Sequence, residues 1–140
     1  MKVVINTCFG GFGLSEAATI AYWGRKGVVV YPDNAGARGI YWDIPQDQQP
    51  PIGAYRITKG APEDAACIAA NAAYNLHTLR IERSVQRHDP DLVAVVEQMG
   101  ARANDRFSDL KVVEIPDNVD YEIQEYDGQE TIAECHRTWS

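Results

Sequence analysis

No apolar run in this chain of 140 residues approaches the roughly 18 residues that a membrane-spanning helix needs. The apolar stretch at residues 1–6 is too short for a secretory signal. We therefore expect a protein of the cytoplasm that has no membrane partner. Apolar residues make up 45% of the chain, which is enough for a core and excludes a disordered or fibrous protein.

Cysteine is scarce and poorly spaced for cross-linking or for metal binding. The three cysteines are Cys8, Cys67 and Cys135, and no two of them form a C-x-x-C pair. This odd count argues against a disulfide framework, and the missing pairs argue against a structural zinc site. We expect no metal and no cofactor. Repeats, low-complexity tracts and linkers are also missing, so one domain is expected over residues 1–140.

Basic residues are almost missing from the last part of the chain. The net charge is −7, yet residues 1–106 carry as many bases as acids. Residues 107–140 hold nine acids against Lys111 and Arg137. An acidic face repels membranes and nucleic acid, so direct nucleic-acid binding is not expected. It attracts a basic protein, imitates a phosphate backbone, or only keeps the chain soluble, and the sequence leaves these alternatives open.

The hydrophobic patterning predicts a single α+β domain, a mainly antiparallel sheet with about three helices packed on one face. Ser15 and the acid-proline triplets at residues 62–64 and 89–91 are typical helix starts. The pair Asp127-Gly128 predicts a type I′ hairpin turn. Strands are expected over residues 2–7, 28–31, 79–85, 110–115, 121–126 and 129–136, helices over 15–27, 62–76 and 89–100, and an irregular segment over 32–53.

The glycine-rich segment after the first predicted strand is the most informative motif. Its glycines leave main-chain N–H groups bare at a helix N-terminus, a geometry that binds phosphate, although the spacing matches no known nucleotide fingerprint. The alternative is a tight turn whose two phenyl rings pack into the core. The candidate ligand-binding residues here are Asn6, Thr7, Cys8, Phe9, Gly10, Gly11, Phe12, Gly13 and Ser15.

Arginine predominates among the bases and supplies candidate clamps for an anionic ligand. Arg83 and Arg87 are such candidates, because a guanidinium binds phosphate bidentately. In the C-terminal tail, Arg137 would pair with phosphate and Trp139 would stack on a base or ring, with His136 beside them. The alternative is that these arginines form surface ion pairs and that Trp139 packs against the sheet.

Cys8 is a candidate nucleophile, because a helix N-terminus lowers the pKa of a thiol. Catalysis would need a base, and His136 is the candidate from another strand. His77 and His88 are the other candidates for this base. The alternative is a buried, inert thiol, and no catalytic residue beyond these is expected.

Both ends of the chain resemble a group of small proteins from phages and bacterial prophages. The resemblance rests on residues 2–15 (KVVINTCFGGFGLS), and it continues in DPDLV, LKVVEIPD, EYDG and HRTW further along the chain. No catalytic activity or ligand is assigned to this group of proteins. The resemblance implies an accessory phage protein in the host cytoplasm, and such proteins often antagonise host defence.

Three functional hypotheses follow. The first is a non-catalytic protein that sequesters a phosphorylated nucleotide-like small molecule. The second is an acidic inhibitor that binds a host defence protein, so that charge reversal of Glu122, Glu125 and Glu130 abolishes its activity. The third is a cysteine-dependent hydrolase or transferase that uses Cys8. A homo-oligomer is compatible with all three.

Overall fold

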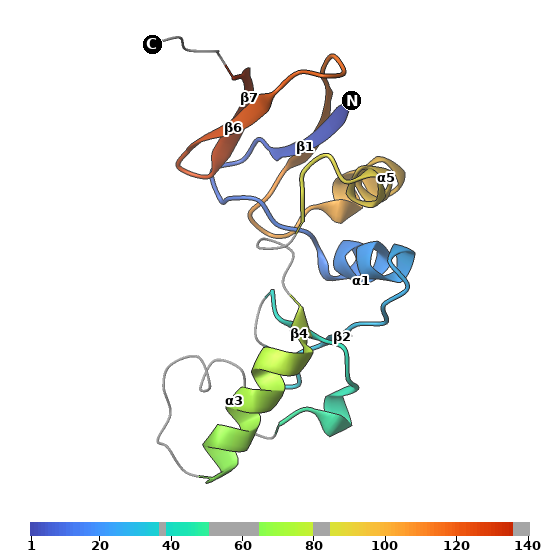
Figure 1. Ribbon diagram of the computed structural model, residues 1–140, viewed down its shortest axis with the longest axis vertical. Helices are drawn as coiled ribbons and strands as arrows, with labels where there is room; N and C mark the ends of the chain where they lie inside the picture. The colour runs from blue at the N-terminus through green and yellow to red at the C-terminus, as the bar shows by residue number, and fades with distance from the viewer. Residues whose placement is uncertain (37–38, 51–64, 80–84, 136–140) are drawn as a thin grey trace. The chain divides into compact units, whose positions relative to one another are not determined.

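The computed structural model describes residues 1–36, 39–50, 65–79 and 85–135 (Figure 1). The chain divides into two compact units, Met1–Tyr22 with Ser84–Ser140 as the first unit and Trp23–Arg83 as the second. The described residues contain three α-helices and seven strands, and every strand pair is antiparallel. The predicted α+β class is confirmed, whereas one domain over residues 1–140 stays a prediction.

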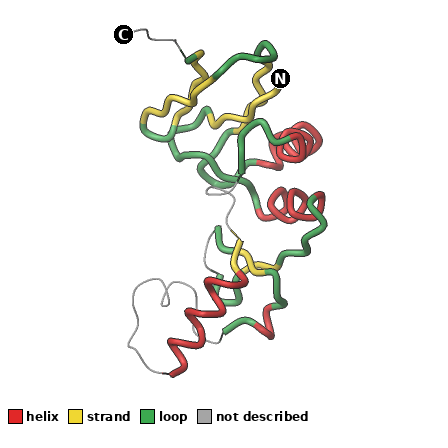
Figure 2. The backbone as a smooth tube through the Cα atoms, in the orientation of Figure 1, coloured by secondary structure: helices red, strands yellow, loops and turns green. Residues whose placement is uncertain are grey.

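Strand β1 (Lys2–Asn6) is the buried centre of the first unit. It pairs along its whole length with β5 (Leu110–Glu114), as expected for a β-branched, apolar segment. Val3 and Val4 are fully buried, and α5 (Pro90–Met99) packs against β1. Helix α5 thus packs on the β1-β5 ladder and contributes buried side chains to the core of this unit (Figure 2).

The hairpin of β6 (Tyr121–Tyr126) and β7 (Gln129–Glu134) follows β5 in the first unit. Asp127 and Gly128 connect its strands with φ angles of 52° and 88°. A type I′ turn needs positive φ at both central residues, so the predicted turn is confirmed. The last strand ends at Glu134, before the predicted boundary at residue 136.

The other edge of β1 explains why the β6-β7 hairpin does not extend the β1-β5 ladder. On this edge Val4 N donates to the Arg87 carbonyl at 2.9 Å, and Asn6 N donates to the Glu130 carboxylate at 2.8 Å. A side chain and a loop thus satisfy the main-chain donors that a neighbouring strand would otherwise use. The described strands of the first unit accordingly form two separate sheets, β1-β5 and β6-β7.

Helix α1 (Glu16–Arg25) begins and ends where the sequence predicts. The Ser15 hydroxyl accepts a hydrogen bond from Ala18 N at 3.1 Å, which confirms the predicted N-cap. The same hydroxyl donates to the Arg102 carbonyl at 2.7 Å. Gly27 follows the last turn with a φ of 79°, a left-handed value that favours glycine.

Helix α5 begins at the second predicted cap. The Asp89 carboxylate accepts a hydrogen bond from Asp91 N at 2.8 Å, and Pro90 occupies the first turn. The Tyr22 hydroxyl donates to the same carboxylate at 2.8 Å. Gly100 caps the other end with a φ of 58°. One aspartate therefore starts α5 and bonds a side chain of α1.

The second unit holds α3 (Ala65–His77) and three two-residue strands, β2 (Tyr31–Pro32), β3 (Tyr41–Trp42) and β4 (Thr78–Leu79). A short 3-10 helix, Gln46–Gln48, follows β3. The strands pair in the order β2-β3-β4, with β3 in the centre. A ladder this short depends on side-chain packing for its stability.

Trp42 is the centre of the packing in the second unit, with 1% of its surface exposed. Its ring packs edge-on against Tyr74 of α3, with ring centroids 5.9 Å apart, and Ile40 completes the buried cluster. Trp42 Nε1 donates to Asp33 Oδ1 at 2.9 Å. The indole thus joins the three-stranded sheet to α3 and to the loop after β2.

The predicted strand over residues 28–31 is wrong for most of its length. Val28 N bonds the Trp23 carbonyl at 2.9 Å, so this residue belongs to the turn that ends α1. Extended pairing begins only at Tyr31. Of the predicted strand 79–85, residues 80–84 lie outside the described residues, as does the predicted helix start at residues 62–64. No helix in the described segments combines the length and the apolar character needed to cross a bilayer.

Candidate functional site

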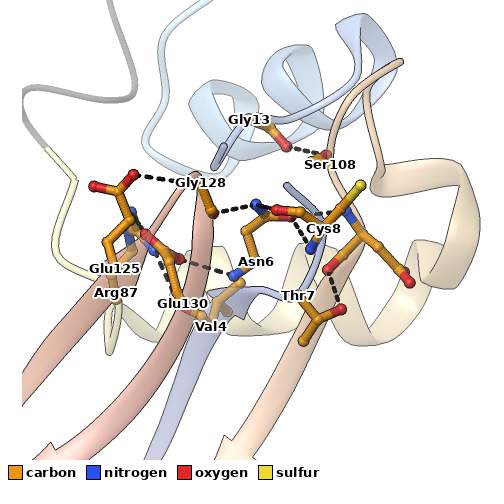
Figure 3. A network of polar contacts seen from close by, with 11 residues as sticks. Val4, Asn6, Thr7, Cys8, Gly13, Arg87, Ser108, Glu125, Gly128 and Glu130 are labelled. Carbon is orange, nitrogen blue, oxygen red and sulfur yellow. Dashed lines mark hydrogen bonds and ion pairs between the residues drawn. The ribbon is translucent and has the colours of Figure 1, made fainter. Parts of the chain in front are cut away.

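Asn6, the last residue of β1, is the centre of a polar network in the first unit (Figure 3). The residue is fully buried. Its Nδ2 donates to the carbonyls of Cys8 at 2.6 Å and Gly128 at 2.8 Å. Its Oδ1 accepts from Cys8 N at 3.2 Å and Asp109 N at 2.9 Å. Both donors and both acceptor positions of one amide are therefore used, and they join three loops.

An ion pair between a buried carboxylate and a partly buried guanidinium completes this network from the hairpin. Glu130 of β7, with 7% of its surface exposed, accepts from Arg87 Nη1 at 2.6 Å and from Arg87 Nη2 at 2.9 Å. One of its carboxylate oxygens also accepts from Asn6 N. Both carboxylate oxygens are thus engaged in charge-assisted hydrogen bonds. The pair fixes the hairpin to β1 and to the segment before α5.

Arg87 is held by the protein from several sides. Its guanidinium carbon lies 3.6 Å from the ring centroid of Phe12, a cation–π contact. Its Nη1 also approaches the Val4 carbonyl at 3.4 Å. The charge of Arg87 lowers the pKa of Tyr121, although burial has the larger, opposite effect and the net shift is upward. The predicted role of Arg87 as a phosphate clamp would therefore require the pair with Glu130 to open.

The glycine-rich loop is shaped by close backbone contacts. A Cβ at Gly10 would collide with the backbone of Phe107, and one at Gly13 would collide with the Asp105 carboxylate. Gly13 also accepts a hydrogen bond from the Ser108 hydroxyl at 2.8 Å. The glycines here therefore allow the loop to lie directly against residues 105–108. This agrees with the tight-turn alternative and places a negative charge beside the loop.

The loop nevertheless keeps bare donors. The N–H groups of Gly10, Gly11 and Phe12 make no hydrogen bond to any residue that the structure describes. Phe9 is 60% exposed, so its ring does not pack into the core, whereas Phe12 is partly buried on Arg87. The loop is thus a tight turn whose N–H groups at residues 10–12 have no partner among the described residues, although Gly11 N lies directly against Gly128.

Of the other predicted site residues, one belongs to this network, and the rest lie elsewhere in the chain or outside the described residues. Thr7 is part of the network, since its N–H and its hydroxyl both donate to the Asp109 carbonyl, at 2.8 and 3.0 Å. Ser15 is the cap of α1. Cys8 is half-buried, and the two described histidines bond other groups, His77 to Asp43 and His88 to Tyr121. Arg83, His136, Arg137 and Trp139 lie outside the described residues.

Sequence reasoning missed the roles of Glu130 and Gly128 in this network. The charge-reversal hypothesis treats Glu130 in the same way as Glu122 and Glu125, but the structure buries its carboxylate against Arg87. The signal was available in the alternation of β7, where Glu130 shares one face with the half-buried Ile132. Asp109 N and the Gly128 carbonyl offered no such signal, because any residue supplies these main-chain groups.

The remaining carboxylates of the hairpin form a separate feature, here called the acidic hairpin. Residues 112–135 contain no lysine, arginine or histidine. The exposed carboxylates of the acidic hairpin are Asp120, Glu122, Glu125, Asp127 and Glu134. Asp117 is excluded from it, because the Met1 ammonium bonds this carboxylate at 2.6 Å and lowers its pKa.

The pKa of the exposed Cys135 thiol shows the sign of the charge at one end of the acidic hairpin. Partial desolvation, and then the charges of Glu122, Asp120 and Glu134, raise the pKa of this thiol. A negative charge is disfavoured at this position because carboxylates surround it. The end of the hairpin therefore repels anions and attracts cations.

No family model, curated protein or solved structure matches this chain. The resemblance to phage and prophage proteins accordingly stays a prediction.

Proposed function

We propose that this chain is a protein-binding module, and that its acidic hairpin receives a basic surface of a partner protein. The observation that carries the proposal is the charge of the hairpin. Five carboxylates are exposed there, and no base is present over residues 112–135. Opposite charge on a partner accelerates association and selects against acidic partners.

The construction of the first unit supports the same proposal. The ion pair of Glu130 with Arg87 and the hydrogen bonds of Asn6 hold the hairpin in a fixed position on β1. A rigid element presents its charges in one arrangement, which lowers the entropic cost of binding. The acidic hairpin is thus a positioned surface rather than a mobile acidic tail.

If the phage resemblance holds, the partner is a basic protein of the bacterial host, and binding would block it. A host defence protein fits this description. Such a partner would recognise carboxylates spaced along a strand pair, in the way that it recognises other polyanions.

Affinity capture from a bacterial lysate tests the proposal with three forms of the chain. The hairpin variant carries Glu122→Gln, Asp127→Asn and Glu134→Gln, all at exposed positions. The control variant carries Glu16→Gln, Asp47→Asn and Glu97→Gln, which change the net charge by the same amount away from the hairpin. We expect the wild type and the control to retain a basic protein that salt elutes, and the hairpin variant to lose it. Retention of the same proteins by all three forms contradicts the proposal.

Binding of a phosphorylated nucleotide-like molecule is the second candidate function. The N–H groups of Gly10, Gly11 and Phe12 favour it, because they bond no residue in the described part of the chain. It ranks second because Asp105 lies beside the loop and because Glu130 occupies the guanidinium of Arg87. Calorimetry with cyclic nucleotides and ADP-ribose measures it, and the absence of heat contradicts it.

A further inference from the structure

One strand of the β6-β7 hairpin has an unpaired edge. Strand β7 pairs with β6 and also lies beside β1, where Asn6 N bonds the Glu130 side chain. Among the described strands, β6 pairs with β7 alone, so its outer edge belongs to no ladder there. This outer edge of Tyr121–Tyr126 is here called the β6 edge. An edge of this kind presents main-chain donors and acceptors that a further strand can use.

The register of the hairpin identifies the main-chain groups that face outward. A two-residue type I′ turn is closed by a hydrogen-bonded pair, here Tyr126 with Gln129, and such pairs alternate along an antiparallel ladder. The bond from Cys135 N to the Asp120 carbonyl at 2.8 Å continues the same alternation beyond the ladder. The residues whose N–H and C=O groups point away from β7 are therefore Tyr121, Ile123 and Glu125.

The outward main-chain groups of Tyr121, Ile123 and Glu125 have no partner among the described residues. Three donors and three acceptors thus recur at every second residue, about 7 Å apart. Another extended chain presents its own main-chain groups at the same spacing. The β6 edge therefore matches a strand rather than a helix or a small molecule.

The charge of the β6 edge decides which strand fits it. Glu122 and Glu125 are exposed, and no base occurs over residues 112–135. A second copy of β6 would bring further carboxylates to this edge and no base to pair with them, and charged side chains on an edge oppose such pairing. Opposite charges on facing strands stabilise a pair instead. The edge thus disfavours its own copy and favours a basic segment.

The alternation of β6 predicts the side-chain pattern of that segment. Ile123 is half-buried and shares a face of the hairpin with Ile132, its partner on β7. Glu122 and Gln124 are exposed on the opposite face. A strand added to the β6 edge places every second side chain beside Ile123 and the others beside Glu122. Alternating apolar and basic residues suit both faces.

We propose that the β6 edge binds an extended segment of the partner protein as an additional antiparallel strand, in which apolar and basic residues alternate. The inference rests on the proposed function, to which it adds the backbone pairing that holds the partner. Main-chain hydrogen bonds supply affinity in this kind of recognition, and alternate side chains supply specificity. Antiparallel pairing is the more stable arrangement per residue. The acidic hairpin accelerates the encounter.

Peptides with blocked main-chain N–H groups test this inference on the full chain by calorimetry. The probe is a short peptide of alternating lysine and valine, used unmodified, N-methylated on its valines, or N-methylated on its lysines. Antiparallel pairing with valines beside Ile123 directs the valine N–H groups toward β6 and the lysine N–H groups away from it. We expect valine methylation to weaken binding at least about tenfold, and lysine methylation to change it less than about twofold.

A matched pair of variants tests the contribution of charge to the same complex. Glu122→Gln should weaken the unmodified peptide about two- to fivefold, because it removes one cross-strand ion pair. Glu16→Gln removes an equal charge at an exposed position of α1 and should leave the affinity unchanged. An equal effect of the two variants contradicts a basic residue beside Glu122.

Hydrogen exchange of the backbone amides gives a second readout that needs no substitution. In the free chain, the amides of Tyr121, Ile123 and Glu125 should exchange faster than those of Glu122 and Gln124, which bond β7. The unmodified peptide should slow the first three about tenfold once about 90% of the chain is bound. A peptide held by charge alone would leave these three amides exchanging at their free rate, which overturns the inference.

The outcomes separate this inference from the function on which it rests. Equal affinity for all three peptides, equal loss in both methylated ones, or a loss confined to lysine methylation overturns the stated pairing and leaves the acidic hairpin standing. If no peptide binds while the wild type still captures a basic protein from the lysate, the inference alone fails. If both experiments fail, the proposed function fails too. A wild-type dimer in light scattering that the peptide dissociates also overturns the inference, because a second copy would then occupy the edge.

Discussion

Replacing Glu130 by alanine is expected to destabilise the first unit by up to about 3–5 kcal/mol, because the change breaks an ion pair between a buried carboxylate and a partly buried guanidinium from one side. The substitution leaves the Arg87 guanidinium without its carboxylate and the N–H of Asn6 without its acceptor. Both groups lie where water replaces the lost partner poorly, since Asn6 is fully buried and Arg87 is mostly covered. A loss of this size is a large part of the 5–15 kcal/mol that typically stabilises a small domain.

Urea unfolding and hydrogen exchange measure the effect of this substitution. The Glu134→Ala change on the same strand removes an exposed carboxylate and should alter the free energy of unfolding by less than about 0.5 kcal/mol. In Glu130→Ala, the amides of β6 and β7 should exchange faster than those of α5, because the hairpin loses its attachment to β1. Equal stability of Glu130→Ala and Glu134→Ala would show that the ion pair does not hold the hairpin.

A double substitution tests whether the pair stabilises the fold by charge or by filling space. Arg87→Met with Glu130→Leu replaces the pair by apolar side chains and leaves no buried charge. We expect this variant to be more stable than Glu130→Ala alone, since the unpaired guanidinium causes most of the loss. The N–H of Asn6 still lacks an acceptor in this variant, so it should remain less stable than the wild type.

Trp42→Ala is the substitution expected to affect the second unit most, with a loss of about 3–5 kcal/mol. The side chain is 1% exposed, packs on Tyr74 and donates to Asp33. Because β2, β3 and β4 have two residues each, their main-chain hydrogen bonds are too few to replace this packing. Thermal unfolding followed by far-ultraviolet circular dichroism measures the loss.

Two further variants identify the source of this effect. Trp42→Phe keeps most of the ring but removes the donor to Asp33, so it should cost about 1–3 kcal/mol. Val29→Ala removes methyl groups from a residue that is 67% exposed, so its effect should stay near zero. If Trp42→Ala unfolds at the same temperature as Val29→Ala, the indole is not the centre of the second unit.

Local signals in the sequence predicted the elements of the first unit well. The caps Ser15 and Asp89 act within three residues of their own positions, and the turn at residues 127–128 depends on the φ angles of two residues. Such features are determined by neighbours in the chain, so one sequence is enough to read them. The strand expected over residues 28–31 failed because the end of α1 competed for the same residues.

The candidate site depended on contacts between distant parts of the chain. Arg87 and Glu130 are 43 residues apart, and Asn6 bonds Gly128 across 122 residues. The alternation of β7 indicates a half-buried face at Glu130, but the exposed Glu134 shares that face, so the contact of Glu130 with Arg87 could not be predicted from it. The charge of the acidic hairpin was visible in the sequence, but its division into one structural and five exposed carboxylates required the fold.

Titration of the isotope-labelled chain with an oligolysine peptide, followed by backbone amide chemical shifts, tests the central claim most directly. If the acidic hairpin receives a basic surface, the amides of β6, β7 and their turn should shift. The shifts should shrink with added salt and in the variant Glu122→Gln, Asp127→Asn, Glu134→Gln. Shifts that are spread evenly over both units, or that persist in this variant, would contradict the claim that the hairpin is the binding surface.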